Sequence, residues 1–431
     1  MVALQKKLFE RLKSDPLLRN SIYLMLSTGV MALFGFVFWL LVAHFYKPEQ
    51  VGVASALISS MSFISYLSLL GFNSTFIRYL PKSDNRNEQI NTGLVLVGAS
   101  AILASSTYVI FAPLFAPRLG FLHSEIFFGA GFVLLSLGAA VNLVTDSIYI
   151  AYRSAGYNLM IDGFIASSIQ LALPILLVGL GTFGIYAAQG SAAFVAMICS
   201  LVFLVLRFNY RPRFKIDRMT LGKVLHYSSG SYVANLLNIL PVVVVPIIVL
   251  NTLGPASAGY YYLAFMMANL LFTVAYAVSQ SLFAEGSHDD SVLKPLMKRS
   301  AAILIAIMVP SSIIFALAGP FVLRLFGASY AVNASGVIFV LAVTGPVVAA
   351  YILGGVMLQI MRKIRLRIIA NVIYVVAICG LVFVWAPRGL PWVAGAWLVG
   401  NAVSALVIFV TLEWQRRGQI SRRTTVLAVS K

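Results

Sequence analysis

Acidic residues are rare in the apolar parts of this chain, and two of them could carry chemistry. Asp146 and Asp162 stand inside apolar stretches, where a charge is costly and is usually kept for an ion or a substrate. Between them lies the short polar turn 152–158, which includes Arg153. We expect all three charges near one membrane face, with the carboxyls as candidates for ion coupling and Arg153 for substrate binding. The alternatives are a structural ion pair that holds two helices together, or carboxylates that simply reach the interface.

Three further side chains are candidates for substrate binding. Arg78 follows an apolar stretch, and a guanidinium there can hold a phosphate through two parallel hydrogen bonds. An ordinary orienting arginine is the alternative. Asn235 and Asn238 share a later apolar stretch with Pro241 and Pro246. Because proline removes a backbone donor and kinks a helix, we expect this helix to bend and line a cavity; the alternative is a kinked helix packed wholly in protein.

No pattern in the sequence indicates an enzyme. The match to G-x-G-x-x-G at 179–184 bridges two apolar stretches instead of following a strand, so it is not a dinucleotide site. There is no P-loop and no arrangement typical of a hydrolase. Both cysteines, Cys199 and Cys379, lie inside apolar stretches, where a small buried apolar role is the usual one. We therefore predict no catalytic residue, no metal site and no cofactor.

The composition is that of a membrane protein. The chain is 60% hydrophobic and 10% charged, with a mean hydropathy of +0.94. A soluble protein of 431 residues could not bury that much apolar surface in one core. The net charge of +18 does not indicate nucleic acid binding, because the basic residues lie in loops beside apolar stretches, where they set orientation and meet anionic lipid headgroups.

The apolar stretches are long enough for about twelve membrane-spanning helices, since about 20 apolar residues cross the hydrocarbon. We therefore predict an all-α polytopic membrane protein. The predicted spans are 21–46, 52–72, 90–115, 126–151, 158–179, 183–206, 224–250, 257–283, 300–324, 332–360, 367–386 and 391–412.

The basic residues predict the orientation. Of the 31 Lys and Arg residues, four (Lys47, Arg118, Arg324 and Arg388) fall on one side of the predicted spans and the other 27 on the opposite side. Because Lys and Arg concentrate in cytoplasmic loops, we expect both the N and the C terminus in the cytoplasm.

The two halves of the chain look like repeats. Pro48 and Gly52 precede the second span, Pro255 and Gly259 precede the eighth, and the shared Pro-x-x-x-Gly pattern recurs after 207 residues. The same offset brings the start of the first span onto the start of the seventh. An even number of spans in each half predicts two six-helix lobes that insert in the same direction, with a cavity between them.

These observations divide the chain into five predicted segments. They are an amphipathic cytoplasmic segment 1–20, a first lobe 21–207, a basic cytoplasmic linker 208–222, a second lobe 223–412 and a basic cytoplasmic tail 413–431.

Several short motifs resemble those of the multidrug/oligosaccharidyl-lipid/polysaccharide (MOP) exporter superfamily, and within it the Wzx-type flippases of polysaccharide biosynthesis. They are the turn 46–52 (YKPEQVG), the stretch 71–81 (GFNSTFIRYLP), the hairpin 152–157 (YRSAGY) and the second Pro-x-x-x-Gly at 255–259. The resemblance covers essentially the whole chain. It implies the MATE/MOP-like fold of two six-helix lobes.

The resemblance also implies a function. A lipid-linked oligosaccharide, carried on a polyprenyl (pyro)phosphate, would cross the cytoplasmic (inner) membrane by alternating access. No covalent bond would change. The expected partners are this glycan lipid, membrane lipids and glycosyltransferases or a glycan polymerase. One departure is that few basic residues fall within the spans: Arg78, Arg153 and Arg324.

Two other functions fit parts of the sequence. An H⁺- or Na⁺-coupled antiporter for drugs or metabolites, from the same superfamily, would use acidic residues such as Asp146. A non-transporting scaffold of a glycan assembly complex would need no polar residues within its spans, and Asp146, Asp162 and Asn238 argue against it.

Overall fold

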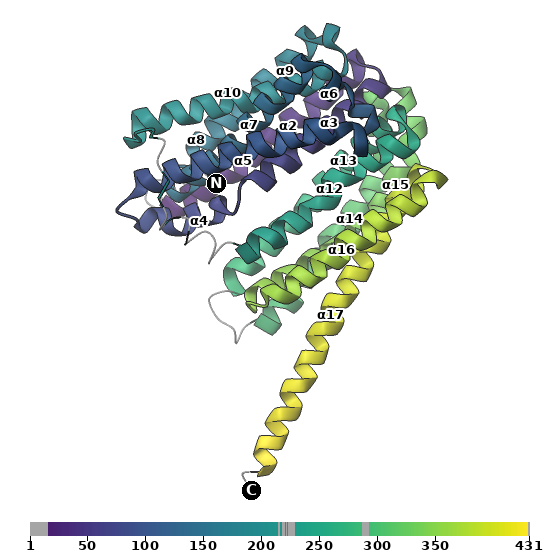
Figure 1. Ribbon diagram of the computed structural model, residues 1–431. Coiled ribbons are helices and arrows are strands. Elements are labelled where there is room, and N and C mark those ends of the chain that lie inside the picture. The colour runs from purple at the N-terminus through teal and green to yellow at the C-terminus, as the bar shows by residue number, and fades with distance from the viewer. Residues whose placement is uncertain are drawn as a thin grey trace, which may run out of the picture. The chain divides into compact units, whose positions relative to one another are not determined.

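The computed structural model describes the backbone of residues 16–213, 216, 217, 220, 222, 229–286 and 293–429. Side chains are described from residue 19 to residue 413, with further gaps at 280–296. Most of the predicted segments 1–20 and 413–431 and part of the linker 208–222 therefore lie outside the described side chains. The described residues form helices and turns without a strand (Figure 1). This confirms the predicted all-α fold.

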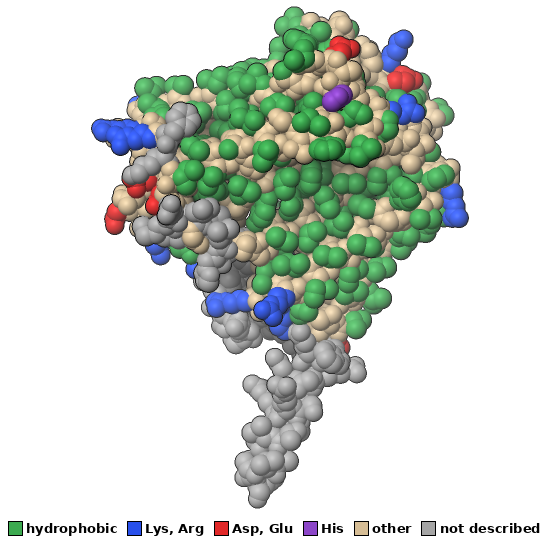
Figure 2. All heavy atoms as spheres, in the orientation of Figure 1, with side chains coloured by type: hydrophobic (Ala, Val, Ile, Leu, Met, Phe, Trp, Pro, Cys, Tyr) green, Lys and Arg blue, Asp and Glu red, His purple; other side chains and the backbone are tan. Residues whose placement is uncertain are grey.

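Twelve helices among the described residues are long and apolar enough to cross a membrane, as predicted. Their outward surfaces are apolar: Leu103, Leu114 and Phe383 expose 71%, 82% and 70% of their side chains. Figure 2 shows hydrophobic side chains over most of the face in view, with few Lys and Arg residues, near the ends of helices. Such surface is stable when it faces lipid, so the chain is a multi-pass membrane protein.

The structure comprises two compact units, each of which is described by itself. Unit 1 contains Met1–Leu236 and Val242–Gly259, and unit 2 contains Leu237–Pro241 and Tyr260–Lys431. The helices up to residue 208 are α2 (Pro16–Phe45), α3 (Pro48–Ser68), α4 (Phe72–Tyr79), α5 (Arg86–Phe115), α6 (Phe121–Ser124), α7 (Ile126–Ala151), α8 (Gly156–Asn158), the π-helix η3 (Leu159–Ala166), α9 (Ser167–Leu176) and α10 (Thr182–Phe208).

The remaining long helices follow the linker. They are α12 (Ser229–Leu253), α13 (Pro255–Gly286), α14 (Leu293–Phe326), α15 (Ala328–Ile360), α16 (Ile364–Trp385) and α17 (Leu390–Val429). Short 3-10 turns occur at η1 (Leu80–Lys82), η2 (Pro117–Leu119), η4 (Val178–Leu180) and η7 (Ala386–Arg388). Figure 1 draws α17 as one continuous helix that runs on well past the predicted end of the last span.

The two Pro-x-x-x-Gly motifs pack against each other inside unit 1. Each proline opens a helix, where its missing N–H is not needed. A Cβ on Gly52 would lie 1.8 Å from the Pro255 carbonyl oxygen, and a Cβ on Gly259 would lie 2.4 Å from the Pro48 carbonyl oxygen. The glycines therefore allow the first turns of α3 and α13 to touch through their backbones.

Unit 1 has a core of buried rings and aliphatic side chains. Phe72, Phe76, Ile148 and Tyr149 are fully buried within one cluster. The Tyr149 hydroxyl donates to the Ser200 carbonyl at 2.7 Å, which satisfies its polar end. This core fixes α7 against α4 and α10 and so positions the acidic residue of α7.

The segment after α10 is fastened to the first turns of α5. The Asn87 amide binds both main-chain groups of Arg211, with its Oδ1 accepting from the N–H at 2.7 Å and its Nδ2 donating to the carbonyl at 3.0 Å. Asn91 Oδ1 accepts from the Arg213 N–H at 2.8 Å and from the Tyr210 hydroxyl at 2.6 Å. Burial raises the pKa of Tyr210 to about 12, so its phenol is protonated at neutral pH and donates.

We expect Asn91→Ala to release this segment. Each hydrogen bond contributes about 1 kcal/mol, so removing two should raise the rate of trypsin cleavage after Arg213 by about thirtyfold, since cleavage follows the opened population. The measurement is limited proteolysis with mass spectrometry. The control is Asn333→Ala, whose amide binds only its own helix, at the Ser329 carbonyl. Equal cleavage of the parent and Asn91→Ala would contradict the expectation.

Candidate functional site: a buried acid–amide cluster

Two helices each carry an Asn followed four residues later by an Asp. Asn142 and Asp146 lie on α7, and Asn158 and Asp162 lie at the start of the next span. Residues four apart share one helix face, so each carboxyl has an amide one turn before it. The repeated N-x-x-x-D spacing is a sequence signal for this pairing that the two carboxylates alone do not give.

The structure brings the two pairs together within unit 1. Asn142 Nδ2 donates to Asp162 Oδ1 at 2.7 Å, and Asn158 Nδ2 donates to the Asp146 backbone carbonyl at 3.3 Å. The two carboxyl groups also interact electrostatically with each other. Two ionised carboxylates repel each other when they are buried close together, so a proton or a cation would stabilise this pair.

The cluster also contains buried oxygen atoms without a hydrogen-bond partner. Among the described residues these include Asn142 Oδ1, Asp146 Oδ1 and Asn158 Oδ1. Asn142 and Asn158 expose only 8% and 6% of their side chains. Unpartnered buried acceptors are unfavourable unless a proton, an ion or water meets them. Two carboxyls and two amides thus form a set of oxygen ligands suited to a proton or a small monovalent cation.

The backbone around Asp162 departs from the α-helix. Leu159–Ala166 forms the π-helix η3, and the Asp162 carbonyl accepts a hydrogen bond from the Ser167 hydroxyl at 2.8 Å. π-helical turns are rare and occur mostly at functional sites. No sequence signal predicted this turn. This π-helical turn determines the direction in which the Asp162 side chain leaves its helix to reach Asn142.

Two tyrosines, one on α3 and one on α7, lie near Asp146. Tyr66 on α3 and Tyr149 on α7 interact electrostatically with Asp146. Tyr149 is fully buried, whereas Tyr66 exposes 36% of its side chain. The cluster is therefore buried on its Tyr149 side and more accessible beside Tyr66.

The two predicted arginines lie outside this cluster's buried part. Arg153 is exposed in the turn after α7, with a left-handed φ of 55°. Arg78 is exposed in the last turn of α4, 5.6 Å from the centre of the Tyr79 ring. Leu70 and Gly71 both have a positive φ and end α3 before α4 begins, so Arg78 lies on a separate short helix.

The predicted residues of the seventh span all lie on α12. This helix is continuous through Pro241 and Pro246, and both prolines are buried. Asn235 is exposed. Asn238 joins a polar network of unit 2, in which its Nδ2 donates to the Tyr351 hydroxyl at 3.0 Å.

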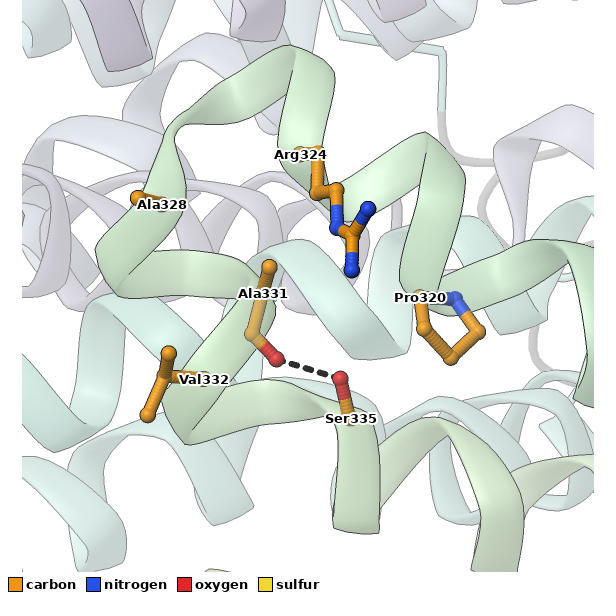
Figure 3. Close-up of a pocket in the computed structure, with 6 residues that line it drawn as sticks. All are labelled: Pro320, Arg324, Ala328, Ala331, Val332 and Ser335. Atoms are coloured by element: carbon orange, nitrogen blue, oxygen red, sulfur yellow. Dashed lines mark hydrogen bonds between the residues drawn. The ribbon is translucent and has the colours of Figure 1, made fainter.

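A pocket of about 360 Å³ lies in unit 2 where α14 ends and α15 begins (Figure 3). The Arg324 side chain borders it together with Pro320, Ala328 and Val332. The hydroxyl of Ser335 is bound to the Ala331 carbonyl of its own helix. With one guanidinium and otherwise small or apolar walls, this pocket lacks the convergent polar groups that the acid–amide cluster has.

Comparison with solved structures shows the fold. The chain is similar to a multidrug-resistance MATE-family transporter of the MOP superfamily in an inward-facing conformation, with 17% identity, a TM-score of 0.69 and coverage of 94% of this chain and 99% of that one. The chain is also similar to an outward-facing MATE-family transporter of the same superfamily, with 16% identity, a TM-score of 0.64 and coverage of 95% of this chain and 96% of that one. For a MOP-superfamily transporter from Pyrococcus furiosus the identity is 17%, the TM-score is 0.64, and the match covers 93% of this chain and 95% of that one.

Comparison with family models shows the family. Residues 41–335 match the model of a family described as polysaccharide biosynthesis protein, which is more than two-thirds of the chain. No curated protein matches the sequence. Together with the transporter fold, the family match confirms the resemblance that the short motifs indicated. The chain belongs to the family described as polysaccharide biosynthesis protein, and it has the fold of MOP-superfamily transporters.

Proposed function

We propose that the chain translocates a lipid-linked oligosaccharide from the cytoplasmic to the outer leaflet of the cytoplasmic membrane. The observation that carries this proposal is a twelve-helix transporter fold in a family of polysaccharide biosynthesis. Polysaccharide assembly that starts on one side of a membrane and ends on the other needs its glycan lipid moved across. The substrate class is a polyprenyl (pyro)phosphate that carries sugars.

The proposed mechanism is alternating access. The sugar and phosphate headgroup enters a polar cavity while the polyprenyl tail stays in lipid, and the six-helix lobes 21–207 and 223–412 then rearrange to release it on the outer side. The chain positions and moves its substrate, and no bond is made or broken. Arg78, Arg153, Asn235 and Asn238 are the proposed substrate-binding residues, with bending of α12 near Pro241 and Pro246.

The acid–amide cluster is the proposed coupling site. A proton on one of the two carboxyls, Asp146 or Asp162, would be replaced by Na⁺ or released when the site opens, and the unpartnered oxygens of Asn142 and Asn158 would complete the cation's ligands. Transport is then linked to an ion gradient, because the site binds its ion differently in the two states.

The orientation follows from the distribution of Lys and Arg. We place both termini in the cytoplasm, with glycosyltransferases or a glycan polymerase as neighbouring proteins and membrane lipids around the spans.

The test is translocation of a fluorescent polyprenyl-phosphate oligosaccharide in proteoliposomes. We expect Arg78→Ala and Arg153→Ala each to slow transport about tenfold, since a lost charged hydrogen bond to phosphate costs about 1.5 kcal/mol. The matched control is Arg388→Ala, an arginine in the 3-10 turn after α16. Absence of translocation by the parent would reject the flippase; normal rates in both variants would reject these arginines as phosphate ligands.

The acidic cluster favours a second candidate. An H⁺- or Na⁺-coupled antiporter of organic cations would also use a buried carboxyl pair, and two of the similar solved structures are described as multidrug-resistance transporters. Exchange of a fluorescent organic cation for H⁺ or Na⁺ in the same proteoliposomes, without movement of the glycan lipid, would favour this candidate. A scaffold would move neither substrate.

A further inference from the structure

The two units contain the same turn between consecutive spans. Arg153 after α7 and Arg362 after α15 lie 209 residues apart and have almost equal left-handed φ values, 55° and 56°. Three backbone hydrogen bonds match at this offset. They are Tyr152 N to Ile148 O, Arg153 N to Ile150 O and Ser154 N to Tyr149 O in unit 1, and Met361 N to Met357 O, Arg362 N to Gln359 O and Lys363 N to Leu358 O in unit 2.

The same offset relates a side-chain hydrogen bond in each unit. Asn142 and Asp162 of unit 1 correspond to Tyr351 and Asn371 of unit 2. Asn142 donates to Asp162 Oδ1 at 2.7 Å, and the Tyr351 hydroxyl donates to Asn371 Oδ1 at 2.9 Å. The positions therefore correspond in space within each unit as well as in sequence.

The charge at these positions is reversed between the units. Asp146 corresponds to Gly355, Asp162 to the neutral Asn371, and Asn158 to Arg367. Unit 1 thus has two acidic groups at this place, while unit 2 has one basic group and no acid. Neither 229–284 nor 291–412 contains an Asp or Glu, so the spans of the second half have no carboxylate of their own.

Polar groups surround Arg367 in unit 2. Tyr276 and Tyr351 both interact electrostatically with it. Asn238 connects the two phenols, because its Nδ2 donates to the Tyr351 hydroxyl at 3.0 Å and its Oδ1 accepts from the Tyr276 hydroxyl at 2.9 Å. The Tyr276 side chain is 43% exposed, so this network reaches the surface of the unit and is open to a ligand.

We propose that Arg367, with Tyr276 and Asn238, forms an anion site that binds the phosphate or pyrophosphate of the transported lipid. A guanidinium can offer two parallel donors to a phosphate, and phenol and amide groups add neutral hydrogen bonds. The first unit would thus hold the coupling cation, and the second would supply an anion site in addition to the proposed phosphate ligands Arg78 and Arg153. This inference rests on the proposed function, and it supplies the basic residue within the spans that the sequence analysis missed.

The test measures binding to the purified full-length protein in detergent. The probe is farnesyl pyrophosphate, a pyrophosphate on a short prenyl tail, with farnesol as the uncharged counterpart, and the readout is isothermal titration calorimetry. We expect Arg367→Gln to weaken farnesyl pyrophosphate binding at least tenfold and to leave farnesol binding unchanged. Arg367→Lys keeps the charge but loses the planar pair of donors, so its affinity for farnesyl pyrophosphate should lie between those of the parent and of Arg367→Gln.

The matched control is Arg365→Gln, which removes the same charge two residues away on the same helix, where the side chain is exposed. Tyr276→Phe tests the site without removing a charge and should weaken binding several-fold. Parent-like binding by folded Arg367→Gln, or an equal loss in Arg365→Gln, would overturn the anion site.

Translocation in proteoliposomes separates this inference from the proposed function. If the parent moves the glycan lipid and Arg367→Gln moves it at the same rate, the anion site is wrong and the flippase stands. If the parent binds farnesyl pyrophosphate through Arg367 but moves no glycan lipid, the anion site stands and the flippase is wrong. If the parent neither binds the pyrophosphate nor moves the lipid, both are wrong.

Discussion

Replacing Asp162 with asparagine is expected to remove gradient-driven transport while leaving the fold intact. An amide neither takes up nor releases a proton at neutral pH, and it supplies no charge for a cation. The variant keeps its shape, because an amide oxygen at this position still accepts the hydrogen bond from Asn142. The measured transport rate with an imposed H⁺ or Na⁺ gradient should fall to the rate without one.

Asp146→Asn should behave in the same way, because the two buried carboxyls interact with each other electrostatically. Asp84→Asn is the matched control, since Asp84 is an exposed carboxylate between α4 and α5. Full gradient stimulation in both cluster variants would show that the acid–amide cluster is structural, which the sequence analysis held open as its alternative.

Replacing Gly52 with alanine is expected to have the largest effect on stability. The added Cβ would meet the Pro255 carbonyl oxygen at 1.8 Å and the Gly259 nitrogen at 2.8 Å. Both are backbone atoms, which cannot turn aside like a flexible side chain, so the first turns of α3 and α13 must separate. Overpacking costs typically 1–3 kcal/mol, and we expect a loss of about 3 kcal/mol here.

The measurement is the fraction of monodisperse protein that remains after heating, followed by size-exclusion chromatography. Gly380→Ala is the control, because a Cβ there meets nothing within 4 Å and alanine favours a helix. The idea of a close backbone contact would fail if Gly52→Ala were as heat-stable as Gly380→Ala.

The number of spans could be predicted because hydropathy alone decides which segments enter a membrane. The repeat could be predicted in part, since Pro48 and Gly52 recur as Pro255 and Gly259. Their mutual contact could not, because two matching motifs do not show that they pack on one another. The break at Leu70 and Gly71 was also missed, since an apolar pattern continues across it.

The site was less accessible from the sequence. The carboxyls of Asp146 and Asp162 stood out because a charge in an apolar stretch is conspicuous, whereas Asn142 and Asn158 became meaningful only once α7 met the following helix. Arg367 was overlooked because it stands at the first residue of a predicted span, where a basic residue is usually an orienting one. Its neighbours come from three other helices, which no local pattern reveals.

The attachment of the linker to α5 has an evolutionary consequence. Asn87 and Asn91 bind Arg211 and Arg213 through main-chain atoms, so at these two positions the attachment does not depend on the side chain, although Tyr210 adds its hydroxyl. Substitutions at Arg211 and Arg213 can therefore change the positive charge of this segment without changing its backbone conformation. Positions 211 and 213 cannot be proline, because proline lacks the N–H that Asn87 or Asn91 binds there. Pro212 lies between them, at a position where neither asparagine needs an N–H.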